Sequence, residues 1–399
     1  MSKMRALPRN VWVLSLTSFL RDIASEMLIH LLPLFLANVL SVRITVIGLI
    51  EGVAETTASL MKIYSGWLSD QLGRRKGLTV GGYGLAALAM PLLLIARTWP
   101  IVLLCRFLDR MGKGIRTAPR DALIADSVGA DQRGVSFGLH RAADSAGAFL
   151  GLLLAIALVW GIQGGSVALD GDTFRAIVIW SMVPAALAVL VVAVGVKEVV
   201  TDRPAVMPRI SFRDVDARFK RFLVVMTLFT LGNSTDAFLV LRAQDGGASV
   251  LAILGLLAGF NLVYTMIAGP AGALSDRMDR RKVIIGGWIL YSLVYLGFAV
   301  ADRTWQFGLL YALYGAFYAL TEGVAKAYVA DLIPETERRG SAYGAYNGVI
   351  GLTALPASVI AGVLWQGVGD WSGLGPAAPF LFGSGISLVA AVLLWRWVD

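Results

Sequence analysis

The first long apolar segment of the chain carries three ionisable side chains at a regular spacing. Asp22, Glu26 and His30 stand four residues apart, so in a helix they lie along one face. An ionised side chain at the centre of a bilayer costs about 2.5–3.5 kcal/mol on insertion scales, and such groups are usually paired or functional. A carboxyl group partly shielded from water keeps its proton more readily and can exchange it. We therefore expect Asp22 and Glu26 to be proton-coupling carboxylates, with a permanent ion pair to an arginine as the alternative.

A denser group of charges occupies the segment 100–124. Its six charged side chains recur along one helical face: Arg106, Asp109, Arg110, Lys113, Arg116 and Arg120. A stripe of this kind facing lipid would be unstable, so the face is expected to meet a cavity or the acidic face of the first segment. We expect the first four of these residues to bind a solute, together with Asp144 of the segment 136–160. For Arg116 and Arg120, anchoring at the interface or gating is an equal alternative.

The second half of the chain is less charged and more aromatic. The segment 305–330 carries a row of polar side chains at helical spacing: Tyr311, Tyr314, Tyr318, Glu322 and Lys326. Tyrosines with hydroxyl groups to place, next to a carboxylate, suit an amphiphilic solute with an organic body. We expect Asp236, Tyr318, Glu322 and Asn347 to contact the solute. The alternative is a packing stripe whose hydroxyl groups bond to the backbone.

Side chains that serve metal or nucleotide chemistry are scarce. Cys105 is the only cysteine and lies in an apolar stretch, and neither His30 nor His140 has a second histidine at metal-binding spacing. The run 112–114 lacks the spacing of a phosphate-binding loop. No catalytic triad or carboxylate pair has a scaffold of its own. The sequence therefore predicts a protein that is not an enzyme, needs no cofactor, has no metal site and draws its energy from an ion gradient.

The composition places these charged residues in a membrane protein. Of 399 residues, 57% are hydrophobic and 16% are charged, whereas roughly a quarter of a soluble domain is charged. A spanning helix needs about 20 apolar residues, so the chain has room for about twelve spans and little else. The expected spans lie near 10–38, 45–69, 78–97, 100–124, 136–160, 174–196, 222–242, 248–273, 283–300, 305–330, 342–366 and 378–397.

The distribution of positive charge predicts the orientation. The net charge of +8 is carried by short clusters between apolar segments, which argues against nucleic acid as a partner. The clusters fall on alternate connections, at 74–76, 133, 197–221, 280–282 and 338–339. By the positive-inside rule these connections and both termini are cytoplasmic. We expect a multi-pass protein of the inner or plasma membrane, whose N-terminal segment is the first span and not a cleaved signal peptide.

The two halves of the chain repeat each other. The segment 66–76 recurs at 272–282, 206 positions further on, and 125–134 recurs at 330–340, 205 or 206 positions further on. Two independent matches at one offset indicate a duplicated unit, as in transporters built from parallel repeats.

The duplicated loop resembles that of the major facilitator superfamily, and in particular its drug/proton-antiporter-like branch. That family has a Gly-x-Leu-Ser/Ala-Asp-Arg-x-Gly-Arg-Arg loop between helices 2 and 3 and a degenerate copy between helices 8 and 9. This chain departs from the pattern at Gln71 and Asp279. Arg106 matches the arginine of the family's helix 4 motif, although Asp109 and Arg110 replace its Gln and Gly. The segment 147–152 does not match the Gly-Pro motif of many antiporters, which leaves the direction of transport open.

The resemblance covers nearly the whole chain and implies an architecture. It implies an all-α membrane protein of twelve helices in two six-helix bundles related by a pseudo-two-fold repeat, with helices 1, 4, 7 and 10 lining a central cavity. We expect an N-terminal bundle over 1–196, a cytoplasmic linker over 197–221 and a C-terminal bundle over 222–399.

The duplicated loops are best interpreted as gates. Their glycine permits close helix approach, and their charged residues can clamp one face and release it as the protein changes state. The expected gating residues are Gly66, Asp70, Arg74, Arg75, Asp276 and Arg280.

Together these features predict a monomeric secondary active transporter in a lipid bilayer. It would move a small polar or amphiphilic solute by alternating access, coupled to protons. The resemblance to family members with this loop favours export, which is their commoner direction of transport. Two alternatives stay open: uptake of a charged metabolite or metal chelate, and a membrane sensor that transports nothing.

Overall fold

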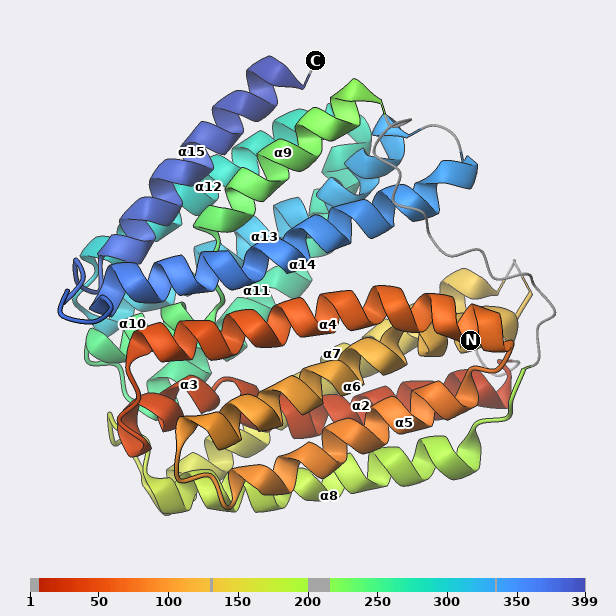
Figure 1. Ribbon diagram of the computed structural model, residues 1–399, viewed down its shortest axis with the longest axis horizontal. Helices are drawn as coiled ribbons and strands as arrows, with labels where there is room; N and C mark the ends of the chain where they lie inside the picture. Colours follow the sequence, from red (N-terminus) through yellow and green to blue (C-terminus); the bar gives the residue numbers. More distant parts are fainter. Residues whose placement is uncertain (1–6, 130–131, 200–215, 334–335, 399) are drawn as a thin grey trace. The chain divides into compact units, whose positions relative to one another are not determined.

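The computed structural model describes residues 7–129, 132–199, 216–333 and 336–398, with the side chains of 336–341 left out. Within these ranges every regular element is helical, and no strand occurs (Figure 1). The predicted all-α fold class is confirmed.

Twelve helical segments match the twelve expected spans. Those of the first half are α2 (Arg9–Ile29) continued by α3 (Leu32–Leu34) and η1 (Phe35–Val39), α4 (Ile44–Leu72), α5 (Lys76–Ala89) continued by η2 (Met90–Leu93), α6 (Trp99–Asp126), α7 (Arg133–Ile162) and α8 (Gly171–Gly195). Those of the second half are α9 (Ala217–Gly232) continued by α10 (Ala237–Asp245), α11 (Val250–Arg277), α12 (Arg280–Val300), α13 (Thr304–Leu332), α14 (Thr336–Gln366) and α15 (Ala378–Trp397).

Two of the expected spans are interrupted, and for the first of them the reason is visible in the sequence. Pro33 has no N–H to donate to the preceding turn, so α2 ends at Ile29 and the chain restarts as α3. Between α9 and α10 the residues 233–236 leave the helix. The sequence predicted continuous helices at both places. Interruptions of this kind expose backbone groups, which membrane proteins tolerate only inside protein or beside water.

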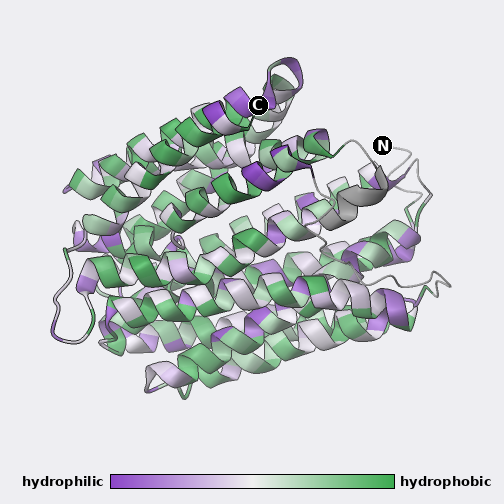
Figure 2. Ribbon diagram, turned by 45° about the horizontal axis from the view of Figure 1, so that its top comes forward, coloured by the Kyte–Doolittle hydropathy of each residue, from purple (hydrophilic) through white to green (hydrophobic). Residues whose placement is uncertain are grey.

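Nine helical segments in the described part of the chain are long and apolar enough to cross a membrane, counting α2 to η1 and α9 to α10 as one each. The charge-bearing helix α6 is not among them, because its charged stripe lowers its apolarity. Figure 2 shows hydrophobic residues along most of the length of the helices, with many hydrophilic residues near their ends.

Contacts within the chain divide it into two units. The first contains Met1–Ser41, Thr57–Gly164 and Leu169–Met207, and the second contains Val42–Thr56, Gly165–Ala168 and Pro208–Asp399. Helix α4 is thus shared, since its first turns belong by their contacts to the second unit. The expected boundaries at 196 and 222 stay predictions, and residues 200–215 of the expected linker lie outside the described residues.

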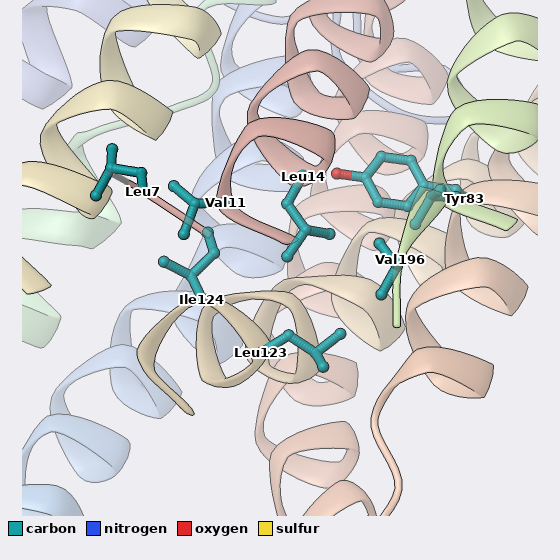
Figure 3. Packing of buried hydrophobic residues seen from close by; sticks show 8 residues of the cluster. Leu7, Val11, Leu14, Tyr83, Leu123, Ile124 and Val196 are labelled. Carbon is teal, nitrogen blue, oxygen red and sulfur yellow. The ribbon is translucent and has the colours of Figure 1, made fainter. Parts of the chain in front are cut away.

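A cluster of buried apolar residues lies at one end of the first unit. Leu14 of α2, Tyr83 of α5, Leu123 of α6 and Val196 after α8 pack together there, with other residues of α2 and α6 (Figure 3). Beside it the amide of Asn10 bonds to both the N–H and the C=O of the residue that follows Val196. The three helices α2, α5 and α6 and the chain leaving α8 are therefore held together at this end.

Helices α2 and α7 approach each other through glycines. A Cβ on Gly147 would overlap the carbonyl oxygen of Phe19, and one on Gly151 would lie 2.6 Å from that of Ile23. Only glycine allows this backbone contact, which is typical of helix pairs in membranes. The charged groups of α2 and α7 are thereby held at a fixed separation.

The second unit has an aromatic core. Phe229 of α9 stacks on Trp288 of α12 with ring centroids 4.4 Å apart, and Tyr291 stacks on Tyr295 at 4.0 Å. Tyr314 of α13 is 1% exposed and completes the cluster. The hydroxyl groups of these buried tyrosines are the polar groups that this core must satisfy.

Candidate functional site

The charged face of α6 meets α2 at an ion-pair cluster centred on Asp109. Arg21 of α2 donates from Nη2 to Oδ1 of Asp109. The other carboxylate oxygen lies 3.6 Å from Nε of Arg110 and 3.9 Å from Nη1 of Arg106. All three arginines are at most 5% exposed. Arg21 was not among the predicted site residues. It precedes Asp22 in the sequence, but its ion-pair partner is Asp109.

A small pocket opens beside this cluster. Its polar lining consists of Arg21, Ser25, Arg106, Asp109 and Arg110, and its apolar lining comes from α2, α3, η2 and α6. Its volume is about 40 Å³. About 10–15 Å³ on this measure holds one water, so the pocket has room for two to four waters or one small ion. In this conformation it is too small for an organic solute.

The expected proton-carrying stripe divides into a paired and an unpaired carboxylate. Oε2 of Glu26 lies 3.0 Å from Nε2 of His30, one turn along α2. Asp22 is half-buried, and its carboxylate makes no hydrogen bond or ion pair with any residue that the structure describes. Asp22 can therefore gain or lose a proton without breaking a direct contact, whereas Glu26 cannot.

Charges of both signs act on Asp22 from neighbouring helices. Asp144 of α7 repels it, and Arg116 and Lys113 of α6 attract it. The guanidinium of Arg116 is itself buried and lies 4.3 Å from the ring centroid of Tyr83. Of the residues predicted to bind solute, the structure thus brings Lys113 and Asp144 into the electrostatic neighbourhood of Asp22.

A polar network continues from Asp144 along the first unit. Oδ1 of Asp144 lies 3.7 Å from Nε2 of His140, and that nitrogen lies 3.5 Å from Oγ of Ser18. Arg120 donates from Nη1 to the same hydroxyl at 3.1 Å and pairs with Asp121 at 2.8 Å. Arg120 therefore has a structural role inside this unit.

The first of the two loops predicted to be gates forms an ion-pair cluster around a buried arginine. Arg75 contacts Asp70 at 3.1 Å through Nη2 and Asp126 at 2.7 Å through Nη1. The carboxylate of Glu198 accepts hydrogen bonds from the backbone N–H groups of Arg75 and Lys76, at the start of α5. An acidic group at a helix N-terminus is favourable because the helix dipole is positive there. Asp126 and Glu198 were missed as site residues, although Asp126 belongs to the second duplicated segment.

Two other expected gating residues of this loop behave differently. A Cβ on Gly66 would lie 3.3 Å from that of Ala118, so this glycine brings α4 close to α6. Arg74 is exposed to solvent. The ion pairs described for this loop are therefore made by Arg75 and not by Arg74.

The second gating loop repeats the arrangement near the surface. Arg280 contacts Asp331 at 2.6 Å and Asp276 at 2.9 Å. The arginine side chain is 26% exposed, and the two carboxylates are 47% and 71% exposed. The same ion-pair pattern thus occurs in both copies at different depths.

In the second unit, Asp236 lies at the interruption between α9 and α10. It accepts a hydrogen bond from the hydroxyl group of Tyr314 at 2.8 Å. The expected solute-binding residue Tyr318 packs edge-on against the ring of Tyr314, with centroids 5.1 Å apart, and against Phe260 at 5.7 Å. The structure therefore brings Asp236 and Tyr318 together through Tyr314.

The remaining expected solute-binding residues of this unit lie further along α13 and α14. Glu322 pairs with Lys326 at 3.0 Å and accepts from the hydroxyl group of Tyr264 at 3.0 Å. The amide of Asn347 donates to the backbone oxygen of Tyr343, one turn back on its own helix. Glu322 is exposed, so its paired carboxylate stays accessible.

Comparison with known proteins identifies the class. A family model described as Major Facilitator Superfamily matches residues 14–241 and 221–399, which together cover nearly all of the chain. The chain belongs to the major facilitator superfamily, as the loop motifs predicted. Members of this family are transporters, and a relative that matches nearly the whole chain is named as one, so the protein is a transporter and not an enzyme.

Individual relatives are consistent with this assignment. An uncharacterized MFS-type transporter of Methanocaldococcus jannaschii is 34% identical over 396 residues, which cover 98% of this chain and 95% of the relative. The multidrug resistance protein MdtG of Citrobacter koseri is 24% identical over 327 residues, 77% of this chain and 76% of that protein. The nucleoside transporter NupG has a TM-score of 0.77 at 13% identity, with 97% of this chain and 99% of that chain covered. The last likeness shows the fold alone.

Proposed function

We propose that the protein is a proton-coupled secondary transporter that exports a small polar or amphiphilic solute by alternating access. The observation that carries the proposal is Asp22, a carboxylate inside a membrane helix that has charged neighbours but no direct partner among the described residues. Maintaining such a group costs stability, so a function is its best explanation. The similarity to MdtG, whose name describes multidrug resistance, supports export.

Proton exchange at Asp22 would change the balance of charge between α2, α6 and α7. Protonation removes the attraction of Asp22 to Arg116 and Lys113 and also its repulsion from Asp144. Glu26, held by His30, is the second proton-coupling carboxylate of the proposal. A one-charge change in a low-dielectric site is enough to bias an equilibrium between two conformations.

The solute would be bound mainly by polar residues that the structure leaves accessible. These are Lys113, Asp144, Asp236, Tyr318, Glu322 and Asn347. Arg106, Asp109 and Arg110 belong to a tight cluster, and in the proposal they contact solute only after that cluster rearranges. The mixture of carboxylates, one ammonium group and tyrosine faces suits a solute with an organic body and a charged or polar group.

The two loops would act as gates. Ion pairs at Arg75 and Arg280 that break and re-form give the two conformations different energies, which a transport cycle requires. We propose a monomer in the cell membrane with both termini cytoplasmic. Because Cys105 is the only cysteine and is buried, single cysteines introduced at Gln71 and Ser166 can test this orientation, and labelling of both from one side would contradict it.

The decisive experiment measures flux of a diverse solute panel in proteoliposomes, with and without an imposed proton gradient. The double variant Asp22→Asn, Glu26→Gln should lose gradient-driven flux, by at least about tenfold, because neither residue can then exchange a proton. Asp172→Asn on α8, which is 85% exposed, is the matched control and should transport normally.

Other outcomes would select the alternatives. Flux that ignores the proton gradient in the wild type would refute proton coupling. Gradient-driven accumulation in the reverse direction would favour uptake of a charged metabolite or chelate. Absence of flux for every solute, from well-folded protein, would favour a sensor.

A further inference from the structure

Two helices of the first unit turn their ionisable side chains toward each other. Along α2, Ser18, Asp22 and Glu26 follow one another at intervals of one turn, and along α7 His140 and Asp144 do the same. His140 is 2% exposed, and its Nε2 lies 3.5 Å from Oγ of Ser18 and 3.7 Å from Oδ1 of Asp144. The acidic face of α2 and the face of α7 that carries Asp144 are therefore opposed.

Backbone contact fixes the separation of these two faces. Gly147, one turn after Asp144, and Gly151 leave no room for a side chain between α7 and the backbone of α2. Among the charged groups that act on Asp22, Asp144 acts most strongly. It outweighs Glu26, although Glu26 lies only one turn further along the same helix as Asp22. Asp22 and Asp144 are thus electrostatic neighbours across the contact between the helices.

The contacts of the carboxylates on these faces single out the same two residues. Glu26 is held by His30 at 3.0 Å. The carboxylate of Asp22 makes no hydrogen bond or ion pair with any residue that the structure describes. Oδ1 of Asp144 is buried and accepts no hydrogen bond from any described residue. A proton can therefore bind to Asp22, or to this oxygen of Asp144, without displacing a hydrogen-bond donor.

A buried arginine of α6 faces this pair with unused donors. Arg116 is 6% exposed and acts on Asp22, and its Nε and Nη1 have no hydrogen-bond partner among the described residues. It can attract Asp22 when that carboxylate is ionised, and it loses this attraction when a proton binds. Helix α8, which packs against α2 and α7, carries charged side chains only in its first turns, and they are exposed. The ionisable groups that face the two carboxylates from α2, α6 and α7 are Glu26, Lys113, Arg116, Arg120 and His140.

We propose that Asp22 and Asp144 form a carboxylate pair that binds one exchanging proton between α2 and α7. The inference rests on the proposed proton coupling and adds a further carboxylate to its proton site. Water on one side of the membrane supplies the proton and water on the other side takes it up, so the pair carries two negative charges without it and one with it. Solute binding by Asp144 is compatible with this role, because a proton and a cationic group of a solute can occupy one carboxylate in turn.

The first test follows the carboxyl groups of the purified protein, without solute, by infrared difference spectroscopy during a pH titration. A protonated carboxyl group and a carboxylate absorb at different frequencies, so Asp22→Asn and Asp144→Asn each identify one signal by its loss. Each substitution should also shift the titration midpoint of the other residue by about one pH unit or more, which is the size that marks coupled sites. Unchanged midpoints, or a titration to which either residue contributes nothing, would overturn the proposal.

Further variants separate the pair from its surroundings. Asp144→Glu keeps a carboxyl group on α7 and should retain the coupled titration. In a His140→Gln background, Asp144→Asn should still shift the midpoint of Asp22, and a shift that vanishes without the imidazole would refute the pair. Asp172→Asn, at the exposed start of α8, is the matched control and should leave both midpoints unchanged. If Asp144→Asn does not fold, the midpoint of Asp144 in Asp22→Asn decides, because coupling is reciprocal.

Flux in proteoliposomes distinguishes failure of this inference from failure of the proposed function. Asp144→Asn should lose gradient-driven flux by at least about tenfold, and Asp144→Glu should retain it, because only the second can exchange a proton. Wild-type flux that ignores the gradient would refute proton coupling, and with it the use of the pair in transport, even if the two residues titrate together. Gradient-driven flux in the wild type combined with independent titration of Asp22 and Asp144 would refute the pair and leave the proposed function standing.

Discussion

The two copies of the duplicated loop make the same ion pairs at different depths. In the first unit Arg75 joins Asp70 to Asp126, and the arginine and Asp126 side chains are only 7% and 9% exposed. In the second unit Arg280 joins Asp276 to Asp331 with every member substantially exposed. A buried pair is costly to break, whereas an exposed pair contributes little. The duplication therefore preserves the pattern of ion pairs, but the ion pairs of the first copy are expected to contribute more to stability than those of the second.

The interiors of the two units differ in a parallel way. The first buries the arginines at 21, 75, 106, 110 and 116, whereas the second buries a group of tyrosines beside the half-buried Asp236 and, among its described residues, the single arginine Arg242. Charged groups change their interactions when a proton or ion binds, and tyrosines at neutral pH do not ionise. This difference supports the proposal that the first unit responds to protons and that the second contacts the organic body of a solute.

The largest effect is expected at the buried gate. Arg75→Ala would leave Asp126 buried without its cation and should cost about 3–5 kcal/mol of stability. Thermal unfolding of the purified variant measures this loss. Arg75→Lys, which keeps the charge but loses the double contact, should be intermediate. If Arg75→Ala lost no more stability than Arg280→Ala, the inference that the buried ion pairs stabilise the protein more than the exposed ones would be contradicted.

How much of this could be predicted from the sequence depends on the physical constraint involved. The twelve helices were predictable because lipid demands about 20 apolar residues per span. The gate contacts within one loop, such as Asp70 with Arg75, follow from spacing. Asp126 as the third member was not predicted, because it is 51 positions further along the chain and only the packing of α6 against the loop brings it there.

In the candidate site too, contacts within one helix were predictable and contacts between helices were not. The stripe of Asp22, Glu26 and His30 was correctly placed on one face, and the Glu26–His30 contact follows from their spacing. Which carboxylate would meet the arginines of α6 was not predictable, because it depends on the rotation of α2 about its axis. That rotation is fixed by Gly147 and Gly151 of a third helix, α7.

A smaller effect is expected in the aromatic interior of the second unit. Tyr314→Phe removes the hydrogen bond to Asp236 and should cost about 1–3 kcal/mol, since a half-buried carboxylate loses a donor. Tyr311→Phe, one turn earlier on α13, is the matched control, because its buried hydroxyl group has no hydrogen-bond partner among the described residues. Chemical unfolding in detergent compares the two. Equal losses would mean that ring packing, and not the bond to Asp236, determines the stability of this core.

The smallest effect on stability is expected for the exposed residues of the two proposed gates. Substitution of these residues should instead lower transport. Arg280→Ala and Asp70→Asn should each change stability by less than about 1 kcal/mol, because solvent screens their ion pairs. Both should lower flux, since a conformational equilibrium shifts about tenfold for only 1.4 kcal/mol of differential energy. Flux per folded molecule in proteoliposomes, measured beside thermal unfolding, separates the two quantities. Normal flux in both variants would mean that gating depends only on the buried contact between Arg75 and Asp126. The second copy of the loop would then be a remnant of the duplication with no part in the transport cycle.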